Sequence, residues 1–305
     1  MKKDMEVKID GKTLKLTNLD KIYFPKEKIT KGDVIEYYQK IAPYILPYLK
    51  DRPESLNRHP NGITGPSFFQ KDVDHMPPKW VKTKNIYSES NDADINYLIC
   101  DDKATLIYMA NLGCIEINPW FSTIKHLDKP DYAVLDLDPE AIGFEKVIEV
   151  ATETHKILDK LKVPNYCKTS GATGLHIYIP LGAKYTYDQA KDFVHLLGML
   201  VNKKLPAITS LERNPKKRQK KIYLDYLQNR KGQTLATPYS LRPKPGATVA
   251  TPLEWREVKK GLTPQQFNIK NIFTRLKQKG DLFKPILGKG VDLKKALTQI
   301  EKFNQ

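Results

Sequence analysis

The chain has 305 residues, of which 40% are hydrophobic and 28% charged, so it can bury a substantial core and is not an extended disordered protein. No window approaches the ~18 uninterrupted apolar residues of a membrane span, and residues 1–20 lack the apolar run of a signal peptide. Lysine and arginine total 51 against 35 acidic residues. The resulting net charge of +16 favours a polyanionic partner such as nucleic acid and predicts a cytoplasmic protein without membrane contact.

Cysteine usage agrees with a reducing compartment. Only three cysteines occur, and their spacing fits neither a disulfide framework nor a cysteine-based zinc site. We expect Cys100, Cys114 and Cys167 to be buried, reduced thiols.

The first predicted element is a hairpin over residues 5–16, turned at Asp10-Gly11. Lys8 and this turn also fit the K-x-D-G motif of nucleotidyl transferases, but Thr13 stands where that motif needs arginine, so we interpret the segment as a turn. Apolar spacing predicts a helix from Thr30 towards Ala42. Strands are predicted over residues 55–59, 66–71, 80–84, 95–100, 105–110 and 114–118.

The second half of the chain alternates strands and helices. We predict strands over 132–138, on both sides of a glycine turn within 166–181, and over 221–227, with helices over 144–163, 187–202 and in the lysine-rich segment after Pro252. Because several strand pairs are joined tightly, the pattern favours an α+β fold with largely antiparallel sheets and flanking helices over a parallel, doubly wound sheet.

Asp136-Leu137-Asp138 ends the apolar strand predicted over 132–138. Residues i and i+2 of a strand share a face, so the two carboxylates point the same way. Paired carboxylates repel each other, and a hard divalent cation relieves that repulsion. The motif indicates a Mg²⁺ or Mn²⁺ site, although a lone D-x-D is more often a turn or a surface feature.

The segment 170–176 places two glycines between Ser170 and His176. Glycine permits close approach of the backbone to a ligand, and N–H groups exposed in such a turn suit phosphate. An exposed strand histidine is the plainer interpretation of His176. The G-x-S-x-G elbow of a hydrolase is absent from the sequence, so we do not predict acyl transfer.

Asp225 supplies a third acid on the strand predicted over 221–227, after the strongly basic stretch 203–221 in which Glu212 is the only acid. Together with Asp136 and Asp138 it would form a three-carboxylate site for two metals. The alternative is an ordinary ion pair with one of the many lysines.

In combination, the sequence resembles the primase-polymerase domain of bacterial ATP-dependent DNA ligase D, of the archaeo-eukaryotic primase superfamily. The motifs that carry the resemblance are LTNLDKIYFP (16–25), RPESLNRHPNG (52–62), FFQK (68–71), NLGCIEINPW (111–120), LDLDP (135–139), SGATGLHIYIPL (170–181), YLDYLQN (223–229) and TPYSLR (237–242). The resemblance implies one primase-polymerase domain over 1–305. A change in the texture of the sequence near 125–130 suggests subdomains 1–128, for DNA binding, and 129–305, the catalytic core with basic C-terminal helices.

The resemblance further implies a template-directed nucleotidyltransferase that fills gaps and extends ends in bacterial non-homologous end joining and prefers ribonucleotides. Two Mn²⁺ or Mg²⁺ ions and NTP or dNTP substrates are implied. So are double-stranded DNA ends and gaps with a 5′-phosphate, a bacterial Ku, a ligase activity and a nucleoid-associated location.

The resemblance also assigns roles to individual residues. The metal ligands and catalytic acids would be Asp136, Asp138 and Asp225; the nucleotide contacts would be Ser170, His176, Arg218, Gln228 and Arg242. The DNA contacts would be Asn18, Lys21, Lys31, Arg52, Arg58, Phe68 and Phe69, with Asn18, Lys21 and Lys31 at the 5′-phosphate. One of the two phenylalanines would stack on a template base, and strand alternation predicts that the other lies in the core.

Two departures affect the expected nucleotide contacts. Asn118 stands where many members have histidine, and Ala172-Thr173 supplies no charge where several have lysine. Alternatives to a polymerase are a two-metal nuclease, a non-catalytic protein that bridges 5′-phosphorylated DNA ends, and a primer-independent primase.

Overall fold

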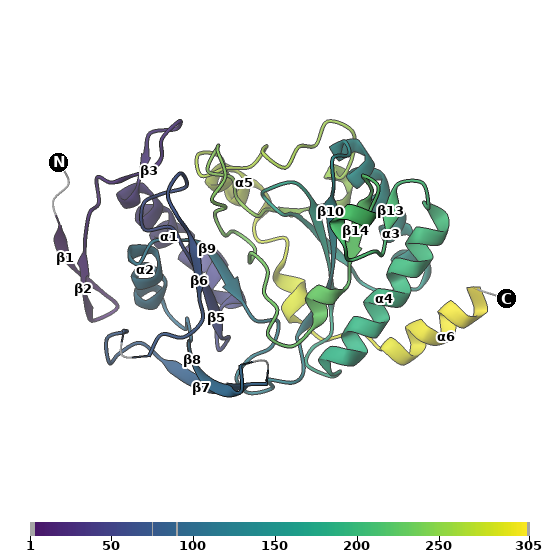
Figure 1. The fold of residues 1–305 in the computed structure, drawn as a ribbon, viewed down its shortest axis with the longest axis horizontal. Coiled ribbons are helices and arrows are strands. Elements are labelled where there is room, and N and C mark those ends of the chain that lie inside the picture. Colours follow the sequence, from purple (N-terminus) through teal and green to yellow (C-terminus); the bar gives the residue numbers. More distant parts are fainter. Residues whose placement is uncertain (1–3, 75, 90, 304–305) are drawn as a thin grey trace. The chain divides into compact units, whose positions relative to one another are not determined.

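The computed structural model describes residues 4–74, 76–89 and 91–303, and the chain forms two compact units (Figure 1). Unit 1 comprises Met1–Lys125, Thr234–Ala250 and Phe267–Phe273. Unit 2 comprises His126–Gln233, Thr251–Gln266 and Thr274–Gln305. The first passage from one unit to the other therefore falls after Lys125, and two later segments return to unit 1.

Unit 1 begins with the predicted hairpin, formed by antiparallel strands β1 (Met5–Ile9) and β2 (Lys12–Leu16). Asp10 and Gly11 both have positive φ, 48° and 79°, as a two-residue type I′ turn requires. The K-x-D-G sequence is therefore part of a hairpin, as predicted.

Helix α1 (Lys31–Ile45) follows the short strands β3 (Ile22–Phe24) and β4 (Ile29–Thr30). Thr30 caps it: the hydroxyl accepts the Asp33 N–H, and the Asp33 carboxylate accepts the Thr30 N–H in return. The helix continues beyond the predicted end into the 3-10 turn η1 (Leu46–Tyr48).

The strand predicted over 105–110 is wrong, because this segment is helix α2 (Lys103–Asn111). The Asp102 carboxylate accepts the Thr105 N–H at 2.8 Å and starts the helix. Leu106, Met109 and Ala110 are fully buried at helical spacing, and a short run that is mostly apolar does not distinguish a strand from a buried helix.

The remaining strands of unit 1 form two sheets. The three-stranded sheet has the order β6 (Phe68–Gln70), β5 (Glu54–Arg58) and β9 (Cys114–Pro119), and β7 (Thr83–Ser88) pairs with β8 (Ala93–Leu98). The returning segment 234–250 binds β9, because the Thr237 N–H donates to the Ile117 carbonyl at 3.0 Å.

Unit 2 is built on a six-stranded sheet in which only one neighbouring pair is parallel. Its order is β13 (Thr209–Ser210), β14 (Ile222–Asp225), β10 (Tyr132–Pro139), β12 (Leu175–Pro180), β11 (Tyr166–Thr169) and β15 (Pro252–Leu253). The predicted α+β fold with largely antiparallel sheets is confirmed.

Two long helices of unit 2, α3 (Phe144–Lys160) and α4 (Tyr187–Lys204), pack on this sheet (Figure 1). Gly198 of α4 faces the Leu224 side chain of β14, so α4 lies on the face opposite Asp225. Shorter elements complete the chain: η2 (Pro215–Lys217), η3 (Leu227–Asn229), η4 (Trp255–Glu257), α5 (Ile272–Lys279), η5 (Lys284–Leu287) and α6 (Leu293–Phe303).

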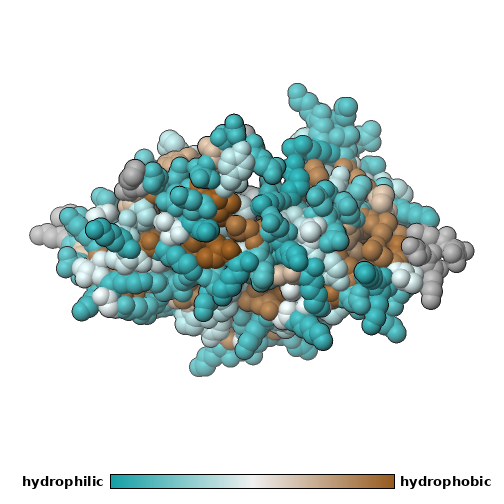
Figure 2. All heavy atoms as spheres, turned by 90° about the horizontal axis from the view of Figure 1, so that it is seen from below, coloured by the Kyte–Doolittle hydropathy of each residue, from teal (hydrophilic) through white to brown (hydrophobic). Residues whose placement is uncertain are grey.

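The surface view agrees with the composition. Figure 2 shows a face covered mainly by hydrophilic side chains, with hydrophobic atoms in smaller patches. Cys100, Cys114 and Cys167 are buried free thiols, as predicted. None of the helices within the described residues is long and apolar enough to cross a membrane.

Candidate active site

Three neighbouring strands of unit 2 bring polar side chains into one row across the sheet. Asp136 of β10 lies opposite His176 of β12 on one side and opposite Asp225 of β14 on the other. Residues opposed in antiparallel strands project from the same face of the sheet. Asp138, two residues along β10, shares that face. The fold therefore places the three predicted acids and His176 on one surface.

Each acid has a different partner. Asp136 Oδ1 lies 3.4 Å from His176 Nε2, and Asp138 Oδ2 lies 3.6 Å from an Arg218 guanidinium nitrogen. The Asp225 carboxylate accepts the Leu227 N–H at 2.9 Å and the Gln228 side-chain amide at 3.1 Å. His176, Arg218 and Gln228, all predicted as nucleotide contacts, thus contact the acids directly.

Arg218 is buried, with 8% of its surface exposed, whereas the other lysines and arginines of the basic stretch 203–221 are not. Its guanidinium donates to the carbonyls of Glu212 and Arg213 at 3.0 and 2.7 Å and lies over the Tyr223 ring, 4.0 Å from the centroid. These contacts fix the cation beside Asp138 while the neighbouring lysines remain at the surface.

The electrostatics of the acids favour a bound cation. Burial raises the pKa of Asp225, and hydrogen bonds from Leu227 and Gln228 oppose that rise only in part. Partial burial also raises the pKa of Asp138. The attraction of Arg218 opposes this rise, and the repulsion of Asp225 adds to it. Desolvated carboxylates close to one another are stabilised by a divalent metal ion.

Carboxylate oxygens are the ligands that Mg²⁺ and Mn²⁺ prefer, so the donor set fits a divalent metal. Among the residues that the structure describes, however, no three His, Cys, Asp or Glu side chains are gathered closely enough to hold an ion. Each of the three acids instead contacts a partner of its own.

The glycine turn between β11 and β12 is tied together by Ser170. Its hydroxyl accepts the N–H groups of Ala172 and Gly174 at 3.1 and 3.0 Å, and its own N–H donates to the Gly174 carbonyl at 2.9 Å. Gly171 has φ of 70°, a left-handed conformation that favours glycine. The turn is thus ordered, with Ser170 holding its backbone.

Arg242 belongs to unit 1, where it pairs with Glu116 of β9. Its Nε donates to a Glu116 carboxylate oxygen at 2.7 Å, and both side chains are largely buried. Asn118 is also buried, and its side-chain amide donates to the Glu116 carbonyl at 3.4 Å. Sequence reasoning missed Glu116, although its alternation with Asn118 in CIEIN signals that the two share one strand face.

Two of the predicted phosphate contacts, Lys21 and Lys31, lie together in unit 1. The Lys31 N–H donates to the Lys21 carbonyl at 2.8 Å, and the Lys31 ammonium donates to the Thr17 carbonyl at 2.7 Å. Burial, the nearby Lys21 and the more weakly acting Arg58 lower the pKa of Lys31 to about 8, although Asp4 opposes this. Asn18 has φ of 55° and its N–H donates to the Asp4 carboxylate.

The remaining predicted DNA contacts differ in exposure. Arg52 is only 2% exposed and donates to the Phe121 carbonyl at 2.7 Å. Arg58 donates to the Leu112 carbonyl and to Gln70, and its guanidinium lies over the Phe68 ring. Phe68 and Phe69 are 47% and 61% exposed. The expectation that one of them is a core residue is wrong, because these successive residues point to opposite faces of β6 and both are exposed.

The model of one protein family, the LigD primase-polymerase domain, matches residues 30–283. The chain is 37% identical over 269 residues to the bifunctional non-homologous end joining protein LigD of Bacillus subtilis (strain 168), covering 88% of this chain and 43% of that protein. It is 29% identical to the multifunctional non-homologous end joining protein LigD of Mycolicibacterium smegmatis, covering 90% of this chain and 36% of the relative. The chain thus spans less than half the length of these relatives.

The structural comparison covers nearly the whole chain. The polymerase domain from Mycobacterium tuberculosis ligase D, solved in complex with DNA, superposes with a TM-score of 0.83 at 28% identity. The match covers 91% of this chain and 99% of that domain. The family implies nucleotidyl transfer with a divalent metal and nucleoside triphosphate substrates. This chain belongs to the LigD primase-polymerase domain family.

Proposed function

We propose that this chain is a template-directed polymerase that fills gaps and extends DNA ends in bacterial non-homologous end joining, with a preference for ribonucleotides. The observation that carries the proposal is the row formed by Asp225, Asp136 and His176 on one face of the unit 2 sheet. In a member of the LigD primase-polymerase family, such a row would supply carboxylates for metal ions and an imidazole for a triphosphate.

The three acids would hold two Mn²⁺ or Mg²⁺ ions. Such ions lower the pKa of an attacking 3′-hydroxyl and neutralise charge on the transferred phosphoryl group. The role of the chain is then to fix the carboxylates on adjacent strands and to keep them ionised. Hydrogen bonds from Leu227 and Gln228 to Asp225 serve the second purpose, because they lower the pKa that burial raises.

The incoming nucleotide would contact Ser170, His176, Arg218, Gln228 and Arg242. His176 lies beside Asp136, and Arg218 lies beside Asp138, so each of these two acids has a proposed nucleotide contact next to it. Positioning and electrostatic stabilisation account for most of phosphoryl-transfer catalysis, so a protein nucleophile is not required.

The 5′-phosphate beyond the gap would bind Asn18, Lys21 and Lys31. The charge of Lys21 lowers the pKa of the Lys31 ammonium, which supports a shared role for the two nearby cations. The exposed rings of Phe68 and Phe69 suit stacking on template bases, and Arg58 beside Phe68 suits a backbone phosphate. Arg52 was also predicted to contact DNA, and that role stays a prediction. A Ku protein and a ligase activity would act on the same DNA ends.

Primer extension on a 5′-phosphorylated gapped DNA tests this proposal. The assay supplies rNTPs or dNTPs with Mn²⁺ or Mg²⁺ and compares the unaltered chain with Asp136→Asn and Asp225→Asn. Asp192→Asn is the matched control, because Asp192 is 73% exposed on α4. We expect extension by the unaltered chain and the control, greater with rNTPs, and none by the other two variants.

Two other outcomes identify the rival functions. Degradation of the gapped DNA without nucleotides, abolished by Asp225→Asn, would support a two-metal nuclease. Binding of 5′-phosphorylated ends by all variants, with no extension by any, would support an end-bridging protein. Synthesis on single strands without a primer would instead identify a primase.

A further inference from the structure

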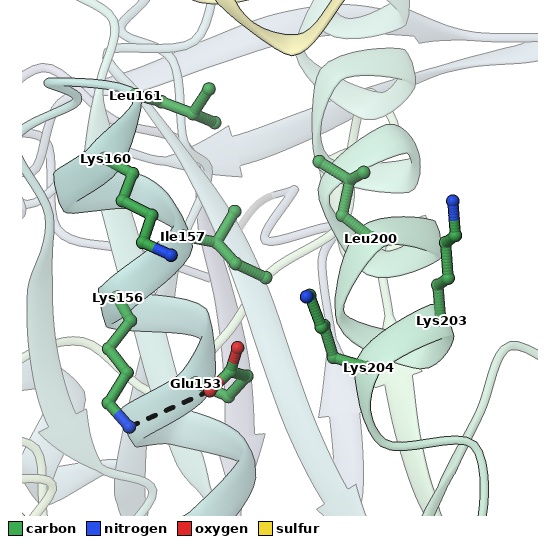
Figure 3. A pocket seen from close by; sticks show the side chains of 8 residues that line it. All are labelled: Glu153, Lys156, Ile157, Lys160, Leu161, Leu200, Lys203 and Lys204. Atoms are coloured by element: carbon green, nitrogen blue, oxygen red, sulfur yellow. Dashed lines mark ion pairs between the residues drawn. The ribbon is translucent and has the colours of Figure 1, made fainter. Parts of the chain in front are cut away.

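A cavity of about 140 Å³ lies between helices α3 and α4 of unit 2 (Figure 3). Three apolar side chains, Ile157, Leu161 and Leu200, point towards one another across the gap. The helices pack on the face of the sheet opposite Asp225, so this cavity is separate from the candidate active site. Its full lining is Glu153, Lys156, Ile157, Lys160, Leu161, Leu200, Lys203 and Lys204.

The rim of the cavity is strongly basic. Four lysines, two from each helix, face a single acid, Glu153. Lys160, Lys203 and Lys204 lie in the last turns of their helices, where a cation also complements the helix dipole. Lys156 lies a turn earlier and is 63% exposed, with Glu153 3.9 Å away, so the dipole does not account for it.

The size of the cavity indicates what it holds. An apolar cavity of ~150 Å³ accommodates a benzene ring, so this one is matched to one large apolar side chain. An apolar floor with a charged rim is the usual composition of a protein-binding groove. A nucleic-acid backbone would use the lysines but would offer nothing to fill the space among Ile157, Leu161 and Leu200.

We propose that this cavity docks an acidic segment of a partner protein. The segment inserts one leucine or phenylalanine side chain between α3 and α4 and places its carboxylates against the lysine rim. The apolar anchor supplies most of the affinity, because it is fully desolvated. The lysines supply orientation and a fast, salt-sensitive association.

The test uses a short fluorescein-labelled peptide of aspartate and glutamate with one central phenylalanine, titrated against the full chain by fluorescence anisotropy. Leu200→Trp fills the cavity, and Lys156→Glu with Lys204→Glu reverses its rim. Lys259→Glu with Lys260→Glu, at exposed positions elsewhere in unit 2, is the charge-matched control. We expect saturable binding that weakens about tenfold or more in the first two variants and is unchanged in the control.

A second peptide, with serine in place of the phenylalanine, should lose affinity to a similar degree. Thermal melting verifies that the variants fold, and gap filling by the rim variant should be unchanged, which separates this proposal from the proposed function. Absence of saturable binding by the unaltered chain would overturn the proposal. Equal binding of the two peptides would also overturn it, as would binding of single-stranded DNA that depends on the lysines and not on Leu200.

Discussion

Gly174, in the turn between β11 and β12, lies against the carbonyl oxygen of Leu137 in β10. A Cβ atom at position 174 would come within 2.1 Å of that oxygen, closer than any real contact. The φ of Gly174 is not in the left-handed region, so steric space alone requires glycine here. Because Leu137 separates Asp136 from Asp138, this contact sets the distance between the Ser170 turn and the acids.

Replacing Gly174 with alanine should therefore displace the turn. We expect Gly174→Ala to lower the free energy of unfolding by about 1–3 kcal/mol, as overpacking does, and to raise the KM for the incoming nucleotide. Gly143→Ala is the control, because a Cβ there meets nothing within 4 Å. Thermal melting and steady-state primer extension measure the two effects. An unchanged KM and melting temperature would contradict this prediction, because the turn would then accommodate the added methyl group.

Arg52 is predicted to stabilise the fold. Arg52→Met removes the donor to the Phe121 carbonyl, and a buried acceptor left without its partner costs about 1–3 kcal/mol. It also removes the cation that opposes the burial-raised pKa of Glu54. We expect a lower melting temperature, whereas Lys50→Met at an exposed neighbouring position should change little. A several-fold loss of DNA affinity at unchanged melting temperature would instead favour the DNA contact predicted from sequence.

The proposed contact of Lys31 with the 5′-phosphate predicts that phosphate recognition depends on pH. Its ammonium is charged below the lowered pKa of about 8, so preference for 5′-phosphorylated over 5′-hydroxyl gapped DNA should fall as the pH rises above about 8. The ratio of the two dissociation constants, measured from pH 6.5 to 9.5, reports this directly. Lys31→Met should have a low, pH-independent ratio. A ratio that is constant with pH in the unaltered chain would exclude Lys31 from the phosphate site.

The lowered pKa of Lys31 also affects the free energy of unfolding, which should rise with pH where the phosphate preference falls. Between about 8 and the ordinary value of 10.5, the unfolded chain binds a proton at Lys31 that the folded chain does not. The contribution of Lys31 to the free energy of unfolding therefore rises with pH in this window. Denaturant melts of the unaltered chain and Lys31→Met, each at several pH values, should diverge in that direction.

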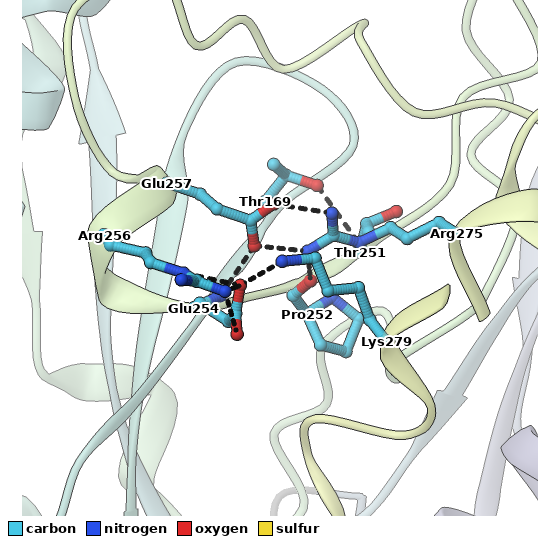
Figure 4. A network of polar contacts seen from close by, with 8 residues as sticks. All are labelled: Thr169, Thr251, Pro252, Glu254, Arg256, Glu257, Arg275 and Lys279. Carbon is cyan, nitrogen blue, oxygen red and sulfur yellow. Dashed lines mark hydrogen bonds and ion pairs between the residues drawn. The ribbon is translucent and has the colours of Figure 1, made fainter. Parts of the chain in front are cut away.

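Arg275 and Glu257 form a bidentate ion pair within unit 2 (Figure 4). The guanidinium donates to both carboxylate oxygens at 2.7 and 2.6 Å and to the Pro252 carbonyl at 2.8 Å. Burial alone would raise the pKa of Glu257, but the hydrogen bonds from Arg275 and from the Glu254 region hold it below its usual range. The pair thus fastens α5 to the edge strand β15.

Loss of this pair should destabilise the chain at neutral pH. Arg275→Lys breaks the bidentate geometry, and we expect the free energy of unfolding to fall by about 1–3 kcal/mol. A carboxylate with a lowered pKa stabilises the fold above its unfolded value of 4.5, so the difference from the unaltered chain should shrink as the pH falls below 4.5. Arg256→Lys, which alters an exposed pair with Glu254, should have little effect. Denaturant melts at pH 7 and pH 4 measure both.

The sequence predicted best where local chemistry is decisive. Asp10-Gly11 specified a hairpin because both residues tolerate positive φ, and LDLD placed two acids on one face because strands alternate. Residues 105–110 were wrongly predicted as a strand because Leu106 to Ala110 form an apolar run, which leaves no periodicity to distinguish a buried helix.

Long-range contacts explain what sequence reasoning missed. The ion pair between Glu116 and Arg242 joins segments that are distant along the chain, so nothing near either residue identifies its partner. The exposure of both Phe68 and Phe69 likewise depends on what packs over each face of β6, which the local sequence does not specify.

The interleaving of the two units has a consequence for anyone who divides this chain. A fragment ending at Lys125 would lack the 234–250 segment, and with it the Thr237 bond to β9 and the partner of Glu116. A fragment beginning at His126 would contain residues 234–250 but not β9, the strand to which they bond. Division after Lys125 would therefore break contacts within unit 1, and point substitutions in the intact chain are the better route to assigning the two sets of candidate contacts.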